Sequence, residues 1–221
     1  MATIGKEIEV KLRIQDIAEL RSKLRRLAAK AGPRMFERNV LYDNPQDDLR
    51  LTGRLLRIRI ESPAPAPKAA VGRRTRPAQR LPSAARGVLT YKAPITGMAS
   101  STTAPRYKER QEIEIVFHPA HALEAILRSL GFRPGFCYEK YRTEYRAAKL
   151  KGLHFDLDET PIGTYLELEG PPAAIDRAAM LLGFSPQDYI TSTYWDLYVA
   201  DCRGRGIPPS DLVFKPTKKL P

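Results

Sequence analysis

Apolar and polar residues alternate in short segments along most of the chain. These segments span 6–14, 36–43, 54–61, 88–94, 106–117, 136–147, 149–158 and 163–170, and Gly, Pro, Asn or Asp residues flank them. Alternation with a period of two is typical of a β-strand that has one apolar and one polar face. The pattern therefore predicts eight strands, which is enough to close a barrel.

Four other segments carry apolar residues at helical spacing. The first begins at Asp16, a favourable N-terminal capping residue, and is predicted to run to Lys30, with Gly32-Pro33 as its stop. The others are predicted at 119–130, 172–182 and 188–201. Amphipathic helices of this kind bury their apolar stripe against another element of the protein.

The polar faces of the predicted strands are charged. Residues i and i+2 of a strand point to the same side, so Glu7, Glu9 and Lys11 share one face of the first strand. The later strands repeat this arrangement, and their charged residues are Arg57 and Arg59; Lys92; Arg110, Glu112 and Glu114; Lys140, Arg142 and Glu144; Asp156 and Asp158; Glu167 and Glu169.

The charged faces, taken together, predict the fold class. The helices cover the apolar faces from outside, and the charged faces then meet inside, where acids and bases compensate one another. We therefore predict an α+β fold, in which an eight-stranded antiparallel β-barrel is closed around a charged tunnel and the helices pack outside it.

Two segments differ from the rest in composition. The segment 62–87 contains five prolines among Ala and Arg residues, and 203–221 is a basic tail. We expect one tunnel domain over 1–202, interrupted by a flexible Pro/Arg-rich insert at 62–87 and followed by the tail.

The net charge of +12 lies mainly on these two segments. The insert contributes +6 and the tail +4, so the remainder is nearly neutral. Because no basic platform with interleaved aromatic residues is present, no specific nucleic-acid partner is expected. No apolar run approaches the roughly 20 residues that span a bilayer, and the N-terminus lacks a secretory signal, so a cytoplasmic protein with no membrane partner is expected.

The charged stripes suit a phosphorylated ligand and a metal ion. Arg and Lys bind phosphate oxygens, whereas clustered carboxylates suit a hard cation such as Mg²⁺ or Mn²⁺. A metal–polyphosphate compound would need both. The Gly-x-x-x-x-Gly-Lys-Ser/Thr motif of P-loop proteins is absent, and the scattered His and Cys residues favour neither a zinc site nor a Ser-His-Asp triad.

Several motifs resemble those of the CYTH superfamily, the triphosphate tunnel metalloenzymes. The segment Glu7-Ile8-Glu9-Val10-Lys11 resembles the family's Glu-x-Glu-x-Lys signature, and Leu56-Arg57-Ile58-Arg59 resembles its Leu-Arg-x-Arg strand. Glu167-Leu168-Glu169-Gly170 follows in the expected order. The similarity covers roughly residues 4–200, and 138–170 looks most like the branch of class IV adenylate cyclases and thiamine triphosphatases.

The resemblance implies roles for individual residues. The expected metal ligands, for Mg²⁺ or Mn²⁺, are Glu7, Glu9, Glu167 and Glu169. The expected phosphate-binding residues are Arg57, Arg59, Lys92, Arg110, Lys140 and Arg142. Lys11 and Asp158 are the candidate catalytic residues. Lys11 is expected to contact the phosphate or to position the acidic residues, and Asp158 is expected to lie close to the metal. Tyr194 is interpreted either as closing one end of the tunnel or as an ordinary core aromatic residue.

The resemblance implies a metal-dependent triphosphate-processing enzyme, either a monomer or a homodimer. Its small substrate would be thiamine triphosphate, tripolyphosphate or a nucleotide. We favour hydrolysis, because the His-Phe pair that often precedes the signature in cyclases is replaced, and because no residues identify a pocket for base and ribose. The alternatives are a class IV adenylate cyclase, which makes cyclic AMP and pyrophosphate from ATP, a non-catalytic polyphosphate-binding module, and an RNA-binding protein that uses the basic insert and tail.

Overall fold

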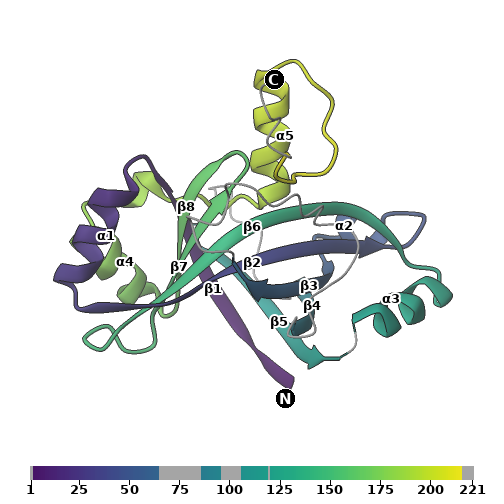
Figure 1. The fold of residues 1–221 in the computed structure, drawn as a ribbon, viewed down its shortest axis with the longest axis horizontal. Helices are drawn as coiled ribbons and strands as arrows, with labels where there is room; N and C mark the ends of the chain where they lie inside the picture. The colour runs from purple at the N-terminus through teal and green to yellow at the C-terminus, as the bar shows by residue number, and fades with distance from the viewer. Residues whose placement is uncertain (1, 65–85, 96–105, 119, 216–221) are drawn as a thin grey trace, which may run out of the picture.

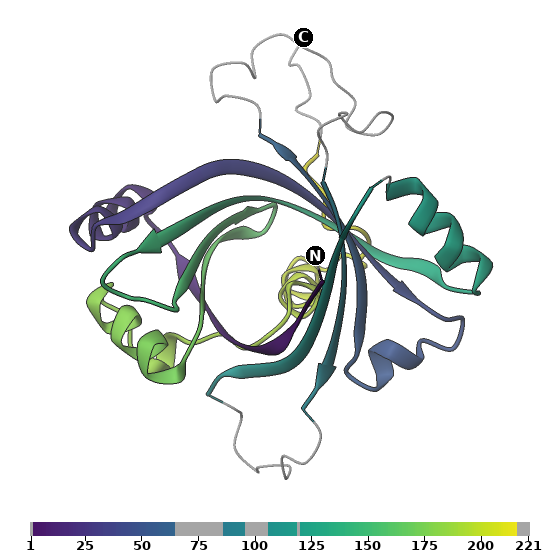
Figure 2. The same cartoon turned by 90° about the horizontal axis from the view of Figure 1, so that it is seen from below.

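The computed structural model describes residues 2–64, 86–95, 106–118 and 120–215, and these form a closed β-barrel (Figures 1 and 2). The strand order is β1-β5-β4-β3-β2-β6-β7-β8, and every neighbouring pair is antiparallel. The predicted fold class is therefore confirmed. The strands are β1 Ala2–Ile14, β2 Ala29–Asp43, β3 Leu55–Pro63, β4 Arg86–Pro94, β5 Lys108–Phe117, β6 Arg133–Ala147, β7 His154–Thr160 and β8 Gly163–Glu169.

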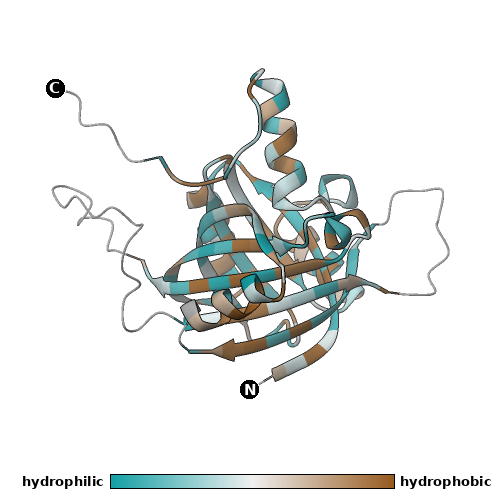
Figure 3. Ribbon diagram, turned by 90° about the vertical axis from the view of Figure 1, so that its right-hand side faces the viewer, coloured by the Kyte–Doolittle hydropathy of each residue, from teal (hydrophilic) through white to brown (hydrophobic). Residues whose placement is uncertain are grey.

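The register between strands places charged residues beside charged residues. Where β1 meets β8, Lys11 lies opposite Glu167, and the next pair toward the N-terminus of β1 is Val10 opposite Leu168. Cross-strand partners share a face of the sheet, so the charged residues of β1 and β8 lie on one face and their apolar residues on the other. Figure 3 shows the resulting alternation of hydrophilic and hydrophobic residues along the strands.

Two helices cover one side of the barrel. These are α1 (Ile17–Arg26) and α4 (Pro172–Leu181), which lie together beside the β1, β7 and β8 strands in Figure 1. Leu24 and Ile175 are fully buried from these helices, against Val10 and Leu168 of the barrel. On another side, α3 (Ala120–Ser129) places Leu127 in a cluster with outward residues of β2 and β3.

The last helix packs at one end of the barrel. It is α5 (Tyr194–Gly204), which projects from the barrel in Figure 1 and is seen end-on in Figure 2. Its Tyr194 and Tyr198 pack with Phe136 and Tyr138 of β6. Because β7 pairs with β6 only from Tyr141 onward, the earlier part of β6 has a free edge, and the chain near Leu212 pairs with that edge.

Some predicted boundaries are wrong. The first helix ends at Arg26 rather than Lys30, and β2 already begins at Ala29. Gly32-Pro33 lies inside β2, where a register shift against β6 accommodates the missing N–H of proline. The four-residue helix α2 (Asp48–Leu51) and the 3-10 turn η2 (Pro186–Asp188) were not predicted.

The last helix begins at Tyr194 rather than 188, because Thr193 and Asp196 form a capping box there. In the described part of the chain, no helix is long and apolar enough to cross a membrane. Most of the 62–87 insert lies outside the described residues, apart from the ends of β3 and β4 that flank it.

Candidate active site: a charged tunnel

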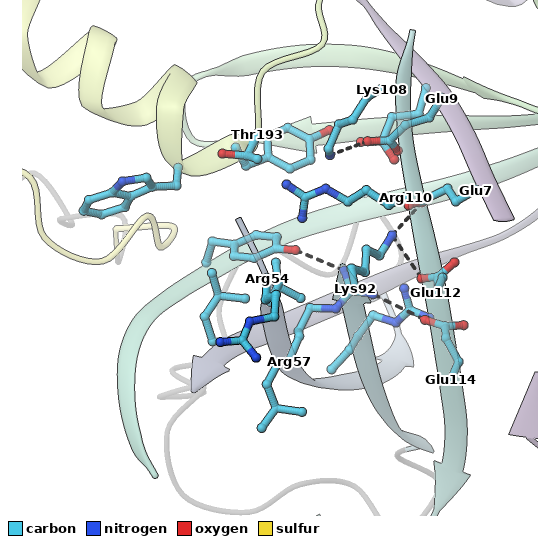
Figure 4. Close-up of a pocket in the computed structure, with 18 of the residues that line it drawn as sticks. Glu7, Glu9, Arg54, Arg57, Lys92, Lys108, Arg110, Glu112, Glu114 and Thr193 are labelled. Atoms are coloured by element: carbon cyan, nitrogen blue, oxygen red, sulfur yellow. Dashed lines mark hydrogen bonds and ion pairs between the residues drawn. The ribbon is translucent and has the colours of Figure 1, made fainter. Parts of the chain in front are cut away.

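A cavity of about 970 Å³ occupies the barrel, and all eight strands contribute to its wall. Eleven of the twelve predicted site residues line this cavity, and several of them are drawn in Figure 4. The eleven are Glu7, Glu9, Lys11, Arg57, Arg59, Lys92, Arg110, Lys140, Arg142, Glu167 and Glu169.

Glu9 and Lys11, two residues apart on β1, form a buried ion pair. Glu9 Oε1 accepts hydrogen bonds from Lys11 Nζ at 2.9 Å and from Lys108 Nζ at 2.6 Å. Burial alone would raise the pKa of Glu9, but the ammonium groups of Lys11 and Lys108 hold it well below its usual range. Lys11 also lies 3.2 Å from Glu167 Oε1, and it stays charged because these two carboxylates raise its pKa despite burial.

Glu7 and Glu169 leave carboxylate oxygens without a cation. Glu7 Oε1 accepts from Lys92 Nζ at 2.5 Å, whereas its buried Oε2 has no hydrogen-bond partner among the described residues. Glu169 forms no ion pair with any described residue. Burial, together with the nearby Glu7 and Glu112 carboxylates, raises the pKa of Glu169 to about 8.

Asp158 lies behind the cavity wall. Its side chain is fully buried and is not among the residues that line the cavity. It accepts from Lys140 Nζ at 2.7 Å and from Arg142 Nη2 at 2.6 Å. The hydroxyl of Tyr194 also donates to it, at 2.8 Å. These contacts position the two basic side chains, and a catalytic role for Asp158 stays a prediction.

Arg142 is the centre of the largest ion-pair network. It contacts Asp156 at 2.8 Å and also donates to Asp158 and Glu167. Burial would lower its pKa, but these carboxylates raise it well above its usual value. Arg142 is therefore fixed in place from three sides.

Arg57 connects the charged wall to an aromatic side chain. Its Nη2 donates to Thr90 Oγ1 at 3.0 Å and lies 3.4 Å from Glu114, while its Nη1 donates to the Tyr138 hydroxyl at 3.2 Å. Its neighbour on the same face, Arg59, pairs with Glu61 at 2.8 Å.

Arg110 differs from these arginines because it forms no ion pair or hydrogen bond with another described side chain. Figure 4 shows it reaching into the cavity between Lys92 and Lys108. An unpaired guanidinium in a cavity is a binding group for an anion.

Tyr194 combines its two predicted interpretations. It is buried in the aromatic cluster and also lines the cavity. The ammonium groups of Lys11 and Lys140 each lie 5.4 Å from its ring centroid. The tyrosine thus belongs both to the aromatic core and to the tunnel wall, where it contacts two of the cations.

Lys108 and Glu37 are two of the wall residues that the sequence analysis missed. Lys108 precedes Arg110 by two residues, so an extension of the alternating stripe would have identified it. Glu37 is followed on its face by Asn39 and Leu41, so β2 has no continuous charged stripe that could have revealed it.

Two of the wall carboxylates fit a divalent ion. As they stand, no three His, Cys, Asp or Glu side chains of the described chain form a ready cluster for a metal. Glu9 and Glu167 are held by cations, whereas Glu7 Oε2 and Glu169 are not. Hard divalent cations bind carboxylate oxygens, so Glu7 and Glu169 fit such an ion.

The model of the CYTH domain family matches residues 5–179 of the chain. A relative from Methanocaldococcus jannaschii, named "Putative adenylate cyclase MJ0240", is 24% identical over 163 residues, which cover 74% of this chain and 75% of the relative.

Solved structures share the same fold. The PH1819 protein of Pyrococcus horikoshii OT3 superposes with a TM-score of 0.63 at 22% identity, over 88% of this chain and 99% of that one. HpAC1 from Hippeastrum, described as a "putative adenylyl cyclase" with a dominant triphosphatase activity, has a TM-score of 0.53 at 18% identity, over 88% and 96% of the two chains.

Proposed function

The chain belongs to the CYTH domain family, and from this premise we propose that it is a divalent-metal-dependent triphosphatase. It binds a small triphosphate inside the barrel and releases phosphate from it. The observation that carries this proposal is the wall of the cavity, in which basic and acidic side chains from all eight strands face one another. Mg²⁺ or Mn²⁺ is the proposed cofactor.

The mutual pairing of the wall explains how the empty tunnel tolerates its charge. Buried charges are costly unless they are paired, and here lysines and arginines neutralise the carboxylates. A triphosphate with its cation carries the same two kinds of charge. The bound ligand and its cation therefore replace ion pairs within the protein by ion pairs between protein and ligand, and the charges of the interior stay balanced.

We assign phosphate binding first to Arg110, since it has no competing carboxylate within bonding distance among the described residues. Arg57, Arg59 and Lys92 face the same cavity and extend this basic surface. Preorganised cations of this kind stabilise the charge that develops during phosphoryl transfer. Lys140 and Arg142 are held more rigidly, with Asp158 as their positioning residue.

We assign metal binding to Glu7 and Glu169, joined by Glu9 and Glu167 from the same two strands. When bound, a divalent ion polarises a phosphoryl oxygen and lowers the pKa of a coordinated water. Lys11 lies between Glu9 and Glu167 and holds both carboxylates on one side of the tunnel.

The alternative is cyclisation of ATP by the same wall. The name of the M. jannaschii relative favours it, whereas the described activity of the Hippeastrum protein favours hydrolysis. Both reactions use charge recognition, but cyclisation also needs the ribose 3′-hydroxyl to be in line with the α-phosphate. The reaction products therefore decide between the two.

The deciding experiment is incubation with Mg²⁺ or Mn²⁺ and each of ATP, thiamine triphosphate and tripolyphosphate. Phosphate, pyrophosphate and cyclic AMP are measured. We expect phosphate release from at least one triphosphate and little cyclic AMP. Cyclic AMP and pyrophosphate as the chief products would establish the cyclase, and binding without any turnover would establish the non-catalytic module.

A further inference from the structure

A second cavity lies beside the tunnel. It has a volume of about 370 Å³ and lies where the connection from α1 to β2 meets the turn between β6 and β7 (Figure 1). Arg146 and His154 line both this cavity and the tunnel, so the two cavities adjoin each other. The ionisable residues in its wall are Lys30, Arg146, Lys151 and His154, and no carboxylate of the described residues lines it. We call this region the basic side cavity.

The turn that carries Lys151 is held in place by the core. Leu150 and Leu153, on either side of this lysine, are buried in the same hydrophobic cluster as residues of α1 and α4. Between them, Gly152 has a φ of 75°, a left-handed conformation that glycine adopts without strain. The backbone at Lys151 therefore has a fixed position, while its side chain is exposed at the cavity.

Lys30 and Arg146 reach the basic side cavity from neighbouring strands. They lie directly opposite each other where β2 pairs with β6, and like charges in such positions destabilise a sheet. Arg146 is compensated in part, because it lies 3.2 Å from Glu144 and 4.0 Å from Asp156. Lys30 forms no ion pair with any described residue. An anion bound between Lys30 and Arg146 would relieve their repulsion.

The charge of the basic side cavity matches that of a phosphate group. Lys151, like Lys30, forms no ion pair with any described residue, so these two ammonium groups are left uncompensated in the described chain. Burial and the nearby Arg146 lower the pKa of His154, so this residue is neutral at pH 7 and adds no charge. A phosphate group carries a charge of about −1.5 to −2 at pH 7, and Lys and Arg side chains donate to its oxygens.

We propose that the basic side cavity is a second anion site, separate from the tunnel, and that it binds orthophosphate. Lys30, Arg146 and Lys151 donate to the phosphate oxygens. This inference goes beyond the proposed function, because binding of phosphate here requires no turnover. Phosphate that is released by hydrolysis in the tunnel would leave it beside this site.

The first test follows phosphate binding residue by residue. Inorganic phosphate is titrated into isotope-labelled protein at constant ionic strength, and the amide resonances are recorded by NMR. The amides of Lys30, Lys151 and Gly152 should shift along one saturable curve. If these amides show no saturable shift, or if potassium chloride alone reproduces the shifts, the proposal is wrong.

The second test compares variants of the turn between β6 and β7. Lys151→Ala should weaken phosphate binding, followed at the Lys30 and Gly152 amides, by about tenfold, the loss expected for one hydrogen bond to a charged group. Lys151→Arg should retain binding, because the charge is kept. Lys149→Ala is the matched control, since Lys149 is exposed in the same turn but lies outside the cavity wall. Equal phosphate affinities of Lys151→Ala and Lys149→Ala would overturn the proposal.

The anion site and the triphosphatase fail in different ways. Lys151 does not line the tunnel, so Lys151→Ala should keep kcat/KM for each triphosphate within about twofold. A parallel loss of phosphate binding and of turnover would show that the cavity belongs to the substrate site, which overturns the separate anion site and leaves the triphosphatase standing. Saturable phosphate binding at the cavity of a protein that turns over no triphosphate would support the anion site and overturn the enzyme.

Discussion

Arg110 and Glu169 are the two predicted site residues that form no ion pair with any described residue. Their neighbours on the tunnel wall are engaged with partners of opposite sign, so these two side chains are free to bind a ligand without first breaking an internal contact. Substitution of Arg110 or Glu169 should therefore weaken ligand binding with little effect on the stability of the protein.

For the metal, we expect Glu169→Gln to remove the metal response while the fold remains. The amide keeps the size of the side chain but lacks the anionic oxygen that a hard cation requires. Thermal unfolding with and without Mn²⁺ measures this directly, because an ion that binds only the folded state raises Tm. The variant should lose both the Mn²⁺-dependent rise and turnover. Glu19→Gln, on the exposed surface of α1, is the control, and an unaltered Mn²⁺ response in Glu169→Gln would refute the assignment.

For the phosphates, Arg110→Ala should raise KM at least tenfold and change the free energy of unfolding by less than about 1 kcal/mol, since no described ion pair is broken. Arg142→Ala should behave oppositely. It leaves Asp156, Asp158 and Glu167 without their shared cation, and breaking a buried pair costs about 3–5 kcal/mol. Urea unfolding and steady-state kinetics on both variants test this difference. A larger loss of stability in Arg110→Ala than in Arg142→Ala would contradict the prediction.

At the scale of elements, the regular alternation of apolar and polar residues predicted the strands reliably. The residues at which elements begin and end were predicted less well. All eight strands exist, but β2 begins seven residues before its predicted start because Ala28, with a φ of 54°, turns the chain directly from α1 into the strand. Helix α2 was missed because its four residues are too few to show a helical period. Tertiary contacts fix it instead: Asp43 accepts from the backbone N–H groups of Leu49 and Arg50.

The chain after α5 acts as an additional edge element. Leu212 donates to the Cys137 carbonyl and accepts from the Glu139 N–H, each at 2.9 Å, and its side chain is buried. Truncation after residue 208 should therefore destabilise the protein by about 3 kcal/mol, from two backbone hydrogen bonds and one buried leucine, and lower Tm by roughly 10 °C. Removal of 216–221 alone is the matched control. Equal Tm values for the two truncations would show that the Leu212 contact contributes nothing.

At the scale of the whole molecule, the sequence predicted the closed barrel because the charged faces had to meet. Individual ion pairs were not predictable, since they depend on strand order and register. β1 pairs with β5 and β8, which are distant in sequence, so the contacts of Lys92 with Glu7 and of Lys11 with Glu167 follow only from closure. For Asp158, likewise, the alternation predicted that the side chain points inward. It did not predict that the side chain is buried behind Arg142.

The compensated interior also predicts how the protein responds to acid. Glu37 is buried, which would raise its pKa, but Lys140, Arg142, Arg59 and Arg57 around it lower the pKa to about 2. A lowered carboxyl pKa contributes stability that is present above the unfolded value of about 4.3 and is lost as the pH falls toward 2. The shift corresponds to on the order of 3 kcal/mol, at 1.36 kcal/mol per pKa unit.

Glu37→Gln should therefore be less stable than the wild type at pH 7, and the difference should shrink to nearly nothing as the pH falls to 2, where about half of the wild-type Glu37 carboxyls are also neutral. The measurement is the free energy of unfolding in urea at several pH values between 7 and 2. Glu144→Gln, at an exposed pair with Arg146, should follow the wild type throughout, because exposed ion pairs contribute little. A Glu37→Gln curve parallel to the wild type across this range would mean that the tunnel cations do not hold Glu37 ionised, and the account of a mutually neutralised interior would then be wrong.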